Sequence, residues 1–455
     1  MTGTGSTPPY AGRTVLVAGA AIAGAAVVRV LLAQGATVLV ADQRESERTA
    51  ELQRLGARFV GLPADLPAGL AAVVVSPGWR PTHPLLVAAG AAGLPVLGEV
   101  ELAWQLRNRM IPWLAVTGTN GKTTTVLMLE SILRAAGLRT VAAGNVGLAL
   151  VDVVAGPYDV LAVELGSPQL HSAPSIAPLA GTVLNIAPDH LDWHGSFEAY
   201  VEAKRRVYQG NRVAVTNADD AWSGRLAEGA ARRTSFTLAD PGPGQLGLRA
   251  GVLLDRSGAV EVALAAVADI PVPGLHNVAN ALAATGLALV YGVPPDAVAR
   301  GLRAFTPAPH RNALVVTVDG VAWVDDSKAT NPHAATASLS AYRQVVWIAG
   351  GLLKGVAVDD FVASIRDRLV AVVLLGADRQ VLADALARHA PDVPVTEVTR
   401  TDNGAMDEVV ARAAGLARPG QTVLLAPAAA SWDMFTDYTA RGRAFAEAVR
   451  RWAAG

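Results

Sequence analysis

The sequence predicts an α/β protein of three domains, each built around a sheet of largely parallel strands. Short apolar runs alternate with helical patterns along most of the 455 residues, which is typical of strand–helix–strand units. A chain of this length exceeds what one hydrophobic core supports. Hydrophobic residues make up 51% of the chain and charged residues 17%, so we expect a globular protein.

The composition argues against several classes of function. A formal net charge of −1 gives no basic footprint for nucleic acid. The absence of cysteine excludes disulfides, thiol catalysis and cysteine-bound metals. Residues 14–41 are strongly apolar, but Arg29, Gln34 and three glycines interrupt them, so they predict a βαβ unit and no signal peptide or membrane span. We therefore expect a cytoplasmic protein that acts on small molecules, as a monomer.

The N-terminal part contains a strand, a Gly/Ala-rich turn and a helix. The turn, residues 19–24, has the spacing of a dinucleotide fingerprint, but Ala21 replaces its middle glycine. Asp42 ends the second strand, and a tight turn at residues 76–78 ends a later one. The expected elements are strands at 15–18, 38–40 and 72–75 and a helix at 25–33. We expect a degenerate Rossmann-like domain over residues 1–109, the alternative being a structural unit that binds nothing.

The most informative stretch is Thr-Gly-Thr-Asn-Gly-Lys-Thr-Thr at residues 117–124. It follows an apolar run at 113–116 and opens a helical pattern, so backbone N–H groups converge on one point, as a polyphosphate requires. Lys122 would place a charge on the terminal phosphates and Thr123 would bind Mg²⁺. The full phosphate-loop pattern has a glycine where this chain has Val116, so an ordinary Gly-rich turn is the alternative.

A central domain is expected over residues 110–306. Alternating patterns predict a largely parallel sheet of the P-loop ATPase type, with helices on both faces. Turn signals within residues 210–268 predict additional antiparallel strands, and a helix at 277–290 closes the domain. The expected parallel strands lie at 140–143, 159–163, 181–185 and 212–216.

A third domain, also Rossmann-like, is expected over residues 307–455, after a Pro-rich linker at 305–309. Its expected strands lie at 321–325, 345–349, 371–375 and 422–426. Polar clusters follow these strands, at 325–328, 350–351, 376–378 and 427–431. Ligands of such sheets bind at the carboxyl ends of the strands.

Several charged side chains stand at strand ends. Glu164 is placed to hold Mg²⁺ beside the phosphate loop, although a solvated strand-end acid is an equal alternative. His190 is a candidate metal ligand that Asp189 would orient, or else a structural histidine. Lys204, taken alone, is a surface lysine. Lys328, among hydroxyl groups, suits a substrate that carries a carboxylate.

Together these motifs resemble those of the Mur ligase family, ATP-dependent enzymes that form amide bonds in peptidoglycan synthesis. The matching segments are 118–123, 144–147, Glu164, 185–192, Lys204, 276–280, 310–311, 326–331, 350–355 and Ser431. Within the family, residues 326–331 and 427–433 look most like those of the members that add D-glutamate to UDP-N-acetylmuramoyl-L-alanine (UDP-MurNAc-L-Ala). The resemblance implies that ATP phosphorylates the alanyl carboxylate and that the amine of glutamate attacks the acyl phosphate.

The resemblance also implies a role for each matching residue. ATP would contact Gly118, Thr119, Asn120, Gly121, Lys122, Thr123, Thr124, Asn277, Asn280, Arg311 and Asp326. Two Mg²⁺ ions would be held by Thr123, Glu164, His190 and a carbamate formed from CO₂ on Lys204. The UDP substrate would contact Ala20, Ala21, Ile22, Asp42, Arg44, Ser76, Pro77, Gly78, Asn145, Gln169 and His190. Glutamate would contact Lys328, Thr330, Ser431 and Tyr438. The implied catalytic residues are Lys122, Glu164, His190, Lys204 and Lys354.

This sequence departs from the family pattern at three places. Gly166 stands where serine is frequent, residues 352–353 are leucines where some members have polar residues, and Ala21 fills a glycine position. Three alternatives to this function remain. They are another ligase of the superfamily, such as a folylpolyglutamate synthetase, another Mur ligase or an L-glutamate-using variant; an NAD-dependent oxidoreductase; and a non-catalytic nucleotide-binding module.

Overall fold

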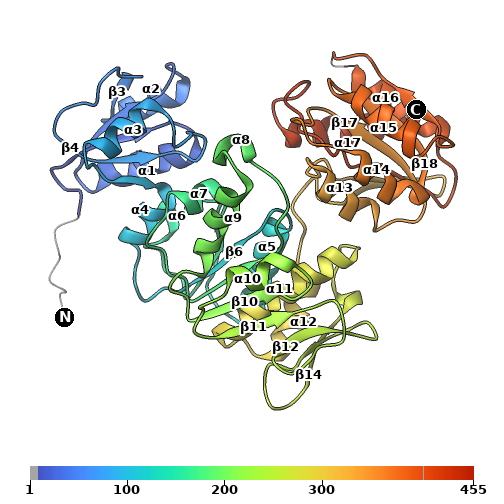
Figure 1. The fold of residues 1–455 in the computed structure, drawn as a ribbon, viewed down its shortest axis with the longest axis horizontal. Helices are drawn as coiled ribbons and strands as arrows, with labels where there is room; N and C mark the ends of the chain where they lie inside the picture. Colours follow the sequence, from blue (N-terminus) through green and yellow to red (C-terminus); the bar gives the residue numbers. More distant parts are fainter. Residues whose placement is uncertain (1–8, 403, 455) are drawn as a thin grey trace. The chain divides into compact units, whose positions relative to one another are not determined.

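The computed structural model describes residues 9–402 and 404–454 and confirms the α/β class. The chain forms three sheets, of five, nine and six strands. Contacts divide it into two compact units. The first contains the chain up to Asp269 together with Ala279–Phe305, and the second contains Ile270–Val278 and the chain from Thr306 onward (Figure 1).

The first sheet is wholly parallel, in the order β3-β2-β1-β4-β5. Its strands are β1 (Thr14–Ala18), β2 (Thr37–Ala41), β3 (Arg58–Gly61), β4 (Leu70–Val75) and β5 (Val96–Gly98). Its helices are α1 (Ile22–Ala33), α2 (Glu47–Arg54), α3 (Pro84–Ala91) and α4 (Glu99–Leu106). Alternate residues of β1 enter two different hydrophobic cores, Val17 one and Leu16 the other. Burial on both faces explains the continuous apolar runs of these strands.

The second sheet has the order β14-β13-β12-β11-β10-β9-β6-β8-β7. Its strands are β6 (Trp113–Thr117), β7 (Ala142–Gly144), β8 (Leu161–Glu164), β9 (Ala180–Val183), β10 (Val213–Asn217), β11 (Arg233–Phe236), β12 (Gln245–Arg249), β13 (Val252–Asp255) and β14 (Val262–Ala266). Strands β6 to β12 are parallel, whereas β13 is antiparallel to both of its neighbours, β12 and β14. The sheet is thus largely parallel, as predicted, and its antiparallel strands fall within the stretch where turn signals predicted them.

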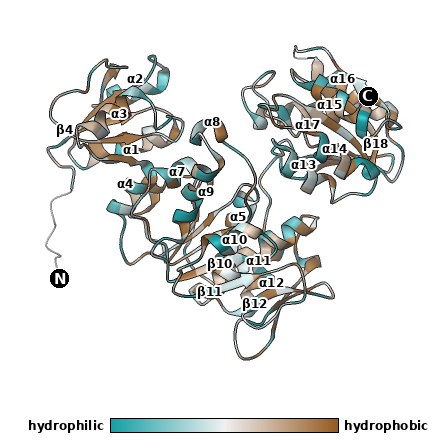
Figure 2. Ribbon diagram, in the orientation of Figure 1, coloured by the Kyte–Doolittle hydropathy of each residue, from teal (hydrophilic) through white to brown (hydrophobic). Residues whose placement is uncertain are grey.

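Helices cover this sheet on both sides. They are α5 (Lys122–Ala135), α6 (Leu150–Val153), α7 (Ser167–His171), α8 (Leu191–His194), α9 (Phe197–Arg205), α10 (Ala221–Leu226), α11 (Leu275–Tyr291) and α12 (Pro295–Ala304), with 3₁₀ turns at Arg206–Tyr208 and Val267–Asp269. Helix α11 begins in the second unit and ends in the first. Figure 2 shows hydrophobic strands within the first and third sheets, as central strands between helices require.

The third sheet has the order β15-β16-β20-β17-β18-β19, with β15 antiparallel at one edge. Its strands are β15 (Ala313–Val318), β16 (Val321–Asp325), β17 (Val345–Gly350), β18 (Leu369–Leu375), β19 (Val395–Glu397) and β20 (Thr422–Leu425). Its helices are α13 (Pro332–Leu339), α14 (Asp359–Ile365), α15 (Arg379–His389), α16 (Ala405–Leu416) and α17 (Tyr438–Ala454), with a 3₁₀ turn at Arg366–Arg368. Trp323 and Trp347 are fully buried on opposite faces of this sheet.

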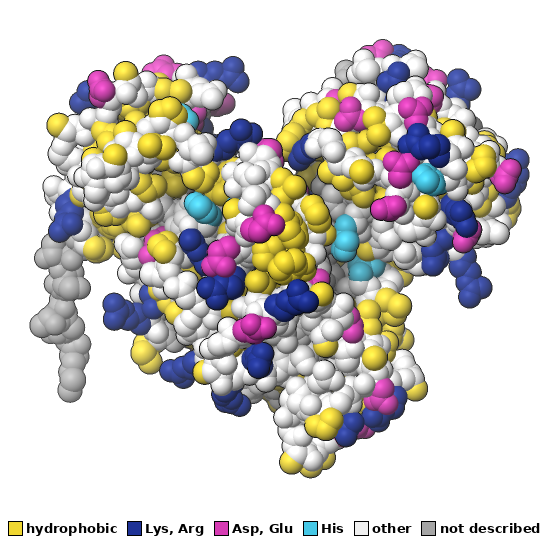
Figure 3. Space-filling view, in the orientation of Figure 1, with side chains coloured by type: hydrophobic (Ala, Val, Ile, Leu, Met, Phe, Trp, Pro, Cys, Tyr) yellow, Lys and Arg dark blue, Asp and Glu magenta, His cyan; other side chains and the backbone are white. Residues whose placement is uncertain are grey.

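Membrane insertion finds no support in these helices. Within residues 9–402 and 404–454, none combines the length and the apolar content that a bilayer crossing needs. On the face shown in Figure 3, acidic and basic side chains are intermixed, in keeping with the net charge of −1.

Candidate active site

The phosphate loop connects β6 to α5, as its sequence predicted. Gly118 and Gly121 have φ of +152° and +85°, values that L side chains rarely adopt. A Cβ on Gly121 would also lie 2.3 Å from Oδ1 of Asn280, so this glycine allows α11 to approach the loop. Val116 is buried within β6 and pairs with β8, so the missing glycine of the motif falls inside a regular strand.

The amine of Lys122 is folded back on its own loop. Its Nζ donates to the carbonyls of Gly118 (2.8 Å) and Thr119 (2.9 Å). The loop itself is fastened to the end of β9, because Asn120 N donates to Asn185 Oδ1 at 2.9 Å. A phosphate group would find a cation and a helix N-terminus at the same place.

Glu164 is buried at the end of β8, next to Thr123. Its Oε2 accepts from Thr123 Oγ1 at 2.7 Å and its Oε1 accepts from Asn145 Nδ2 at 2.9 Å. Only 1% of its surface is exposed, so the alternative of a solvated strand-end acid is wrong. A hydroxyl and a carboxylate this close are oxygen ligands of the kind that Mg²⁺ prefers.

Lys204, on α9, is buried. The prediction of a surface lysine, made from this residue taken alone, is therefore wrong. Lys204 is 2% exposed, and its Nζ donates to the carbonyl of Gly118 at 2.7 Å. Burial lowers its pKa well below the ordinary value, and the neighbouring charge of Lys122 lowers it further. Tyr200, one turn earlier on the same helix, contacts both Lys204 and the phosphate loop. Its ring lies 4.8 Å from Lys204 Nζ, and its hydroxyl lies 2.7 Å from Thr119 Oγ1.

His190 lies between β9 and α8, directly before the first residue of α8. Its side chain is 52% exposed, and Asp189 Oδ2 lies 3.6 Å from its Nε2. Its φ of +51° is a left-handed value that is uncommon for residues other than glycine. In the described part of the chain, no three His, Asp or Glu side chains converge as a ready metal site.

The N-terminal turn is held by Asp42, Gly19 and Gly24. Ala20 N donates to Asp42 Oδ2 at 2.8 Å, and a Cβ on Gly24 would lie 1.8 Å from the carbonyl oxygen of Gly19. Ala21 has φ −67° and ψ −171°, an extended conformation that any residue adopts. The missing middle glycine therefore has no effect on the path of the turn.

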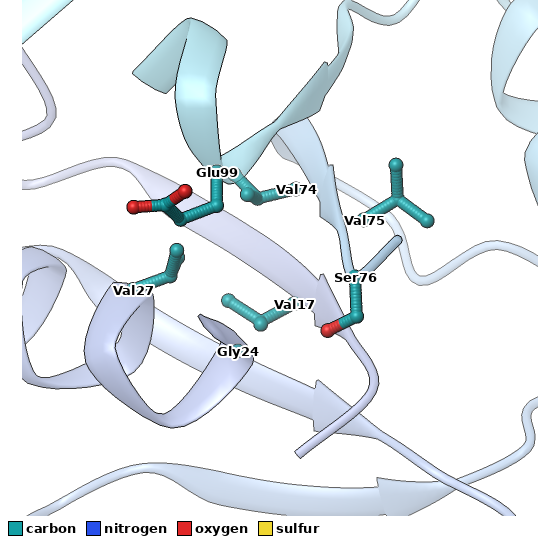
Figure 4. Close-up of a pocket in the computed structure, with 7 residues that line it drawn as sticks. All are labelled: Val17, Gly24, Val27, Val74, Val75, Ser76 and Glu99. Atoms are coloured by element: carbon teal, nitrogen blue, oxygen red, sulfur yellow. The ribbon is translucent and has the colours of Figure 1, made fainter. Parts of the chain in front are cut away.

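A small pocket lies behind this turn (Figure 4). Ser76 donates from Oγ to the carbonyl of Gly19 at 3.1 Å and closes one side of it. Glu99, from the start of α4, lies on the other side. The residues that line it are Val17, Gly24, Val27, Val74, Val75, Ser76 and Glu99. Four of these are valines, so the pocket is mostly apolar and belongs to the packing of α1 against β1 and β4.

In the second unit, polar side chains gather at the carboxyl ends of β16, β17 and β20. Lys328 Nζ lies 4.1 Å from the centre of the Tyr438 ring, and the exposed Lys354 lies 4.6 Å from the Trp432 ring. Both contacts are cation–π interactions. Ser431 is buried in the segment that follows β20, so Lys328, Lys354 and Ser431 all lie beyond the carboxyl ends of strands of this sheet.

Two further groups were expected to meet ATP from this unit. Asp326 accepts from Asn312 N at 3.2 Å, and burial raises its pKa to about 6. Arg311 acts in the opposite direction through its charge. His310 Nδ1 lies 2.6 Å from Asp325 Oδ2, so residues 310–311 are anchored to the end of β16.

Comparison with known proteins identifies the family. The model described as Mur ligase middle domain matches residues 116–288, that described as Mur ligase, glutamate ligase domain matches 310–429, and that described as Mur ligase MurD-like, N-terminal domain matches 13–98.

This chain belongs to the Mur ligase family.

Relatives and solved structures agree with this assignment. A protein of Streptomyces coelicolor named UDP-N-acetylmuramoylalanine--D-glutamate ligase is 55% identical over 97% of this chain and 98% of its own length. One of the same name from Thermobifida fusca is 54% identical over 96% of this chain and 98% of its own. The structure of UDP-N-acetylmuramate-alanine ligase from Thermotoga maritima has a TM-score of 0.61 at 21% identity, and covers 97% of this chain and 100% of that one. The last likeness concerns the fold alone.

Membership of the Mur ligase family gives meaning to the departures from its pattern. A Cβ on Gly166 would lie 3.4 Å from Gln169 Oε1 and 3.7 Å from Asn145 Oδ1, so the space for a small side chain is open. Leu353 is buried and its N–H donates to Asp378 Oδ2 at 2.7 Å. Leu352 pairs through its backbone with Ala430. These leucines shape the loop that presents Lys354.

The structure brings together some of the expected site residues. In the first unit, Lys122, Thr123, Glu164 and Lys204 surround the phosphate loop, and Asn280 touches it. Asn277, one helical turn earlier on α11, belongs with the second unit. Sequence reasoning overlooked Tyr200, although its position four residues before Lys204 on a helix was a usable signal.

The small number of lysines was a second signal for the expected site residues. The chain contains four lysines among its 38 basic residues, and these are Lys122, Lys204, Lys328 and Lys354. All four are expected site residues. At all other basic positions arginine provides the positive charge.

Proposed function

We propose that this chain is an ATP-dependent ligase that joins D-glutamate to UDP-MurNAc-L-Ala during peptidoglycan synthesis. The observation that carries the proposal is the 55% identity, over 97% of the chain, to a relative that bears the name of this activity. The match of residues 310–429 to a glutamate ligase domain agrees with it. Its substrates are then three small molecules, and it works as a monomer in the cytoplasm.

Each part of the chain takes one substrate in this proposal. Residues 1–109 bind the UDP end, residues 110–306 bind ATP, and residues 307–455 bind glutamate. The first part supplies Ala20, Ala21, Ile22, Asp42, Arg44, Ser76, Pro77 and Gly78. An apolar side chain as exposed as Ile22, at 69%, is available to cover the flat face of a base. Asn145, Gln169 and His190 then contact the acceptor near its reacting carboxylate.

The first chemical step is phosphoryl transfer. An oxygen of the alanyl carboxylate attacks the γ-phosphorus of ATP, the bond to the β–γ bridging oxygen breaks, and ADP leaves. Lys122 turns from the carbonyls of its own loop to the terminal phosphate when ATP binds. Residues 118–124 supply backbone N–H groups, while Asn277, Asn280, Arg311 and Asp326 hold the rest of the nucleotide. Two Mg²⁺ ions, when bound, neutralise the charge that develops on the phosphoryl oxygens.

The donor set of the first unit suits these ions on one condition. Thr123 and Glu164 provide oxygen ligands for one Mg²⁺ and His190 a nitrogen for the other. Lys204 is a ligand only if its amine has added CO₂ and lost a proton, since a carbamate is an anionic oxygen ligand and an ammonium is repelled. A lowered pKa supports this step, because only the neutral amine attacks CO₂.

The second step forms the amide. Lys328, Thr330, Ser431 and Tyr438 hold glutamate, with its carboxylates on Lys328 and the hydroxyls. Its neutral amine attacks the carbonyl carbon of the acyl phosphate, and the tetrahedral intermediate expels inorganic phosphate. Lys354 stabilises charge on the reacting groups.

Phosphate release by the purified enzyme tests the proposal. With ATP, Mg²⁺ and UDP-MurNAc-L-Ala, we expect release that depends on D-glutamate and is absent with L-glutamate or L-lysine. Release with L-glutamate alone would assign an L-glutamate-using variant, and release with a folate acceptor would assign a folylpolyglutamate synthetase. Binding of NAD with no release from any acceptor would overturn the ligase assignment.

A further inference from the structure

Arg441, in the first turn of α17, is a buried cation that the reaction described above does not use. Its side chain is 1% exposed. Burial lowers its pKa to about 10, so the guanidinium remains charged at neutral pH. Burying a charge is costly unless every donor finds a partner, so the partners of this group indicate what it stabilises.

The hydrogen-bond partners of Arg441 are hydroxyl and carbonyl oxygens. Its Nε donates to Ser327 Oγ at 3.0 Å and its Nη2 to the carbonyls of Ser327 (2.9 Å) and Ala429 (3.0 Å). Its Nη1 donates to the carbonyl of Gly350 at 3.4 Å. The carboxylates of Asp325 and Asp433 favour the charge from further away. The planar fork of one guanidinium therefore collects oxygens from the loops that follow β16 and β20 and from the last residue of β17, where a third loop begins.

These loops follow β16, β20 and β17, at the carboxyl edge of the sheet. Ser327 directly precedes Lys328, Ala429 lies two residues before Ser431, and Gly350 lies four residues before Lys354. The three carbonyls point toward one place, where their dipoles would repel one another without a cation. A point charge on a lysine could not reach all of them in the directions that the fork provides.

Helix α17 is fitted closely against the same loops. Ser327 Oγ, which accepts from Arg441, also donates to the carbonyl of Tyr438 at 2.8 Å. A Cβ on Gly442 would lie 2.2 Å from His310 Nδ1, so glycine is needed there for the helix to approach. Tyr438 in turn carries the Lys328 amine on its ring.

We propose that Arg441 is a positioning residue of the amino-acid site, which holds the loops of Lys328, Ser431 and Lys354 in the spacing that glutamate requires. The inference rests on the proposed function, because those side chains are the ones that bind glutamate there. Arg441 itself touches no substrate and acts through the three loops that its guanidinium joins.

Steady-state kinetics of Arg441→Lys test this role, because the variant keeps the charge and loses the fork. We expect the KM for D-glutamate to rise about tenfold or more, while the KM values for ATP and the UDP acceptor change about twofold or less. The control is Arg451→Lys on the same helix, an exposed arginine paired with Asp407 at 2.6 Å. It should leave all three KM values unchanged.

A second variant keeps the test decisive if Arg441→Lys does not fold. Ser327→Ala removes the hydroxyl that links Arg441 to Tyr438, and it should raise the KM for D-glutamate selectively, by a smaller factor. Equal rises in all KM values, or a lower melting temperature with unchanged KM values, would overturn the inference. Wild-type enzyme without any D-glutamate-dependent phosphate release would instead refute the proposed function.

Discussion

Glu99 is a buried carboxyl group that links the stability of the first unit to pH. It begins α4, and its Oε1 accepts from Val151 N, at the start of α6, at 2.8 Å. Burial, the largest cause, raises its pKa from 4.5 to about 7. Between these values the folded chain keeps a proton that the unfolded chain has lost. The stability from this group is therefore complete below about pH 4.5 and is lost as the pH rises through about 7.

The variant Glu99→Gln removes this titration and keeps an oxygen that can accept from Val151. We expect the fall in the free energy of unfolding between pH 4.5 and pH 7 to be smaller in the variant than in the wild type. Urea unfolding at several pH values measures it, with the exposed Glu45→Gln as control. Identical pH profiles of the wild type and Glu99→Gln would show that Glu99 does not titrate in this range.

Lys204 carries the second prediction at this scale. If it is carbamylated, Lys204→Ala removes an anionic ligand and should abolish most activity. The gap left behind is about the size of the lost side chain, so added acetate should enter and restore part of the rate. Lys204→Arg should not respond to acetate, because its guanidinium fills the gap and keeps a positive charge. Full activity of Lys204→Ala without acetate would contradict the carbamate.

The low lysine content makes a direct measurement possible. With four lysines in the chain, enzyme equilibrated with carbon-13 bicarbonate and Mg²⁺ should give one carbamate signal by NMR. The signal should be absent from Lys204→Ala and present in the Lys354→Ala control.

Loss of the Lys328 side chain should change the KM for glutamate and the KM for ATP to different extents. Removing the charged partner of a carboxylate should weaken glutamate binding by about 1.5–3 kcal/mol, or roughly ten- to a hundredfold. Lys328→Ala should therefore raise the KM for glutamate far more than that for ATP. Equal effects on both would place Lys328 outside the amino-acid site.

At the scale of elements, a glycine stands at each end of α5, Gly121 before it and Gly137 after it. We expect ATP turnover to depend on Gly121 more than on Gly137. Gly121 and Gly137 have similar φ, +85° and +82°, so alanine strains the backbone equally at both. A Cβ at Gly121 would meet Asn280, whereas a Cβ at Gly137 has nothing within 4 Å. Gly121→Ala should lower ATP turnover about tenfold or more, and Gly137→Ala about twofold or less. Similar losses in both variants would mean that α11 does not constrain the loop.

Elements with strong local signals could be predicted closely. The strand predicted at 321–325 is β16 with the same bounds, because its apolar run ends in a cluster of polar residues. Strand β15 was missed, although Asp319 and Gly320, with φ of +49° and +76°, form the tight turn that joins it to β16. An Asp-Gly pair between apolar runs is a hairpin signal that deserved more weight.

The sequence predicted which residues belong to the candidate site better than it predicted whether their side chains are buried. The turn between β6 and α5 and the carboxylate of Glu164 follow from local patterns. The burial of Lys204 does not, because only tertiary contacts, such as the hydrogen bond of its Nζ to the Gly118 carbonyl, turn that face of α9 inward. The role of Arg441 was equally invisible, since its partners lie 12 to 114 residues away along the chain.

On the scale of the whole molecule, the two compact units divide the proposed chemistry. In the proposal, the phosphate loop and the metal ligands belong to the first unit, whereas the glutamate-binding residues and part of the nucleotide contacts belong to the second. Helix α11 belongs to both, because residues 270–278 group with the second unit and the chain from Ala279 with the first. A boundary read from the linker at 305–309 could not reveal that division, since contacts and not chain order define a unit.

Isotope transfer tests the central claim, that the chain activates the acceptor by phosphorylating its carboxylate. UDP-MurNAc-L-Ala labelled with oxygen-18 in the alanyl carboxylate is incubated with ATP, Mg²⁺, D-glutamate and the wild-type enzyme, and the inorganic phosphate is analysed by mass spectrometry. An acyl phosphate transfers one carboxylate oxygen to phosphorus, so we expect one labelled oxygen in each phosphate released during ligation. Phosphate without label, in a reaction that still yields the amide, would contradict the account.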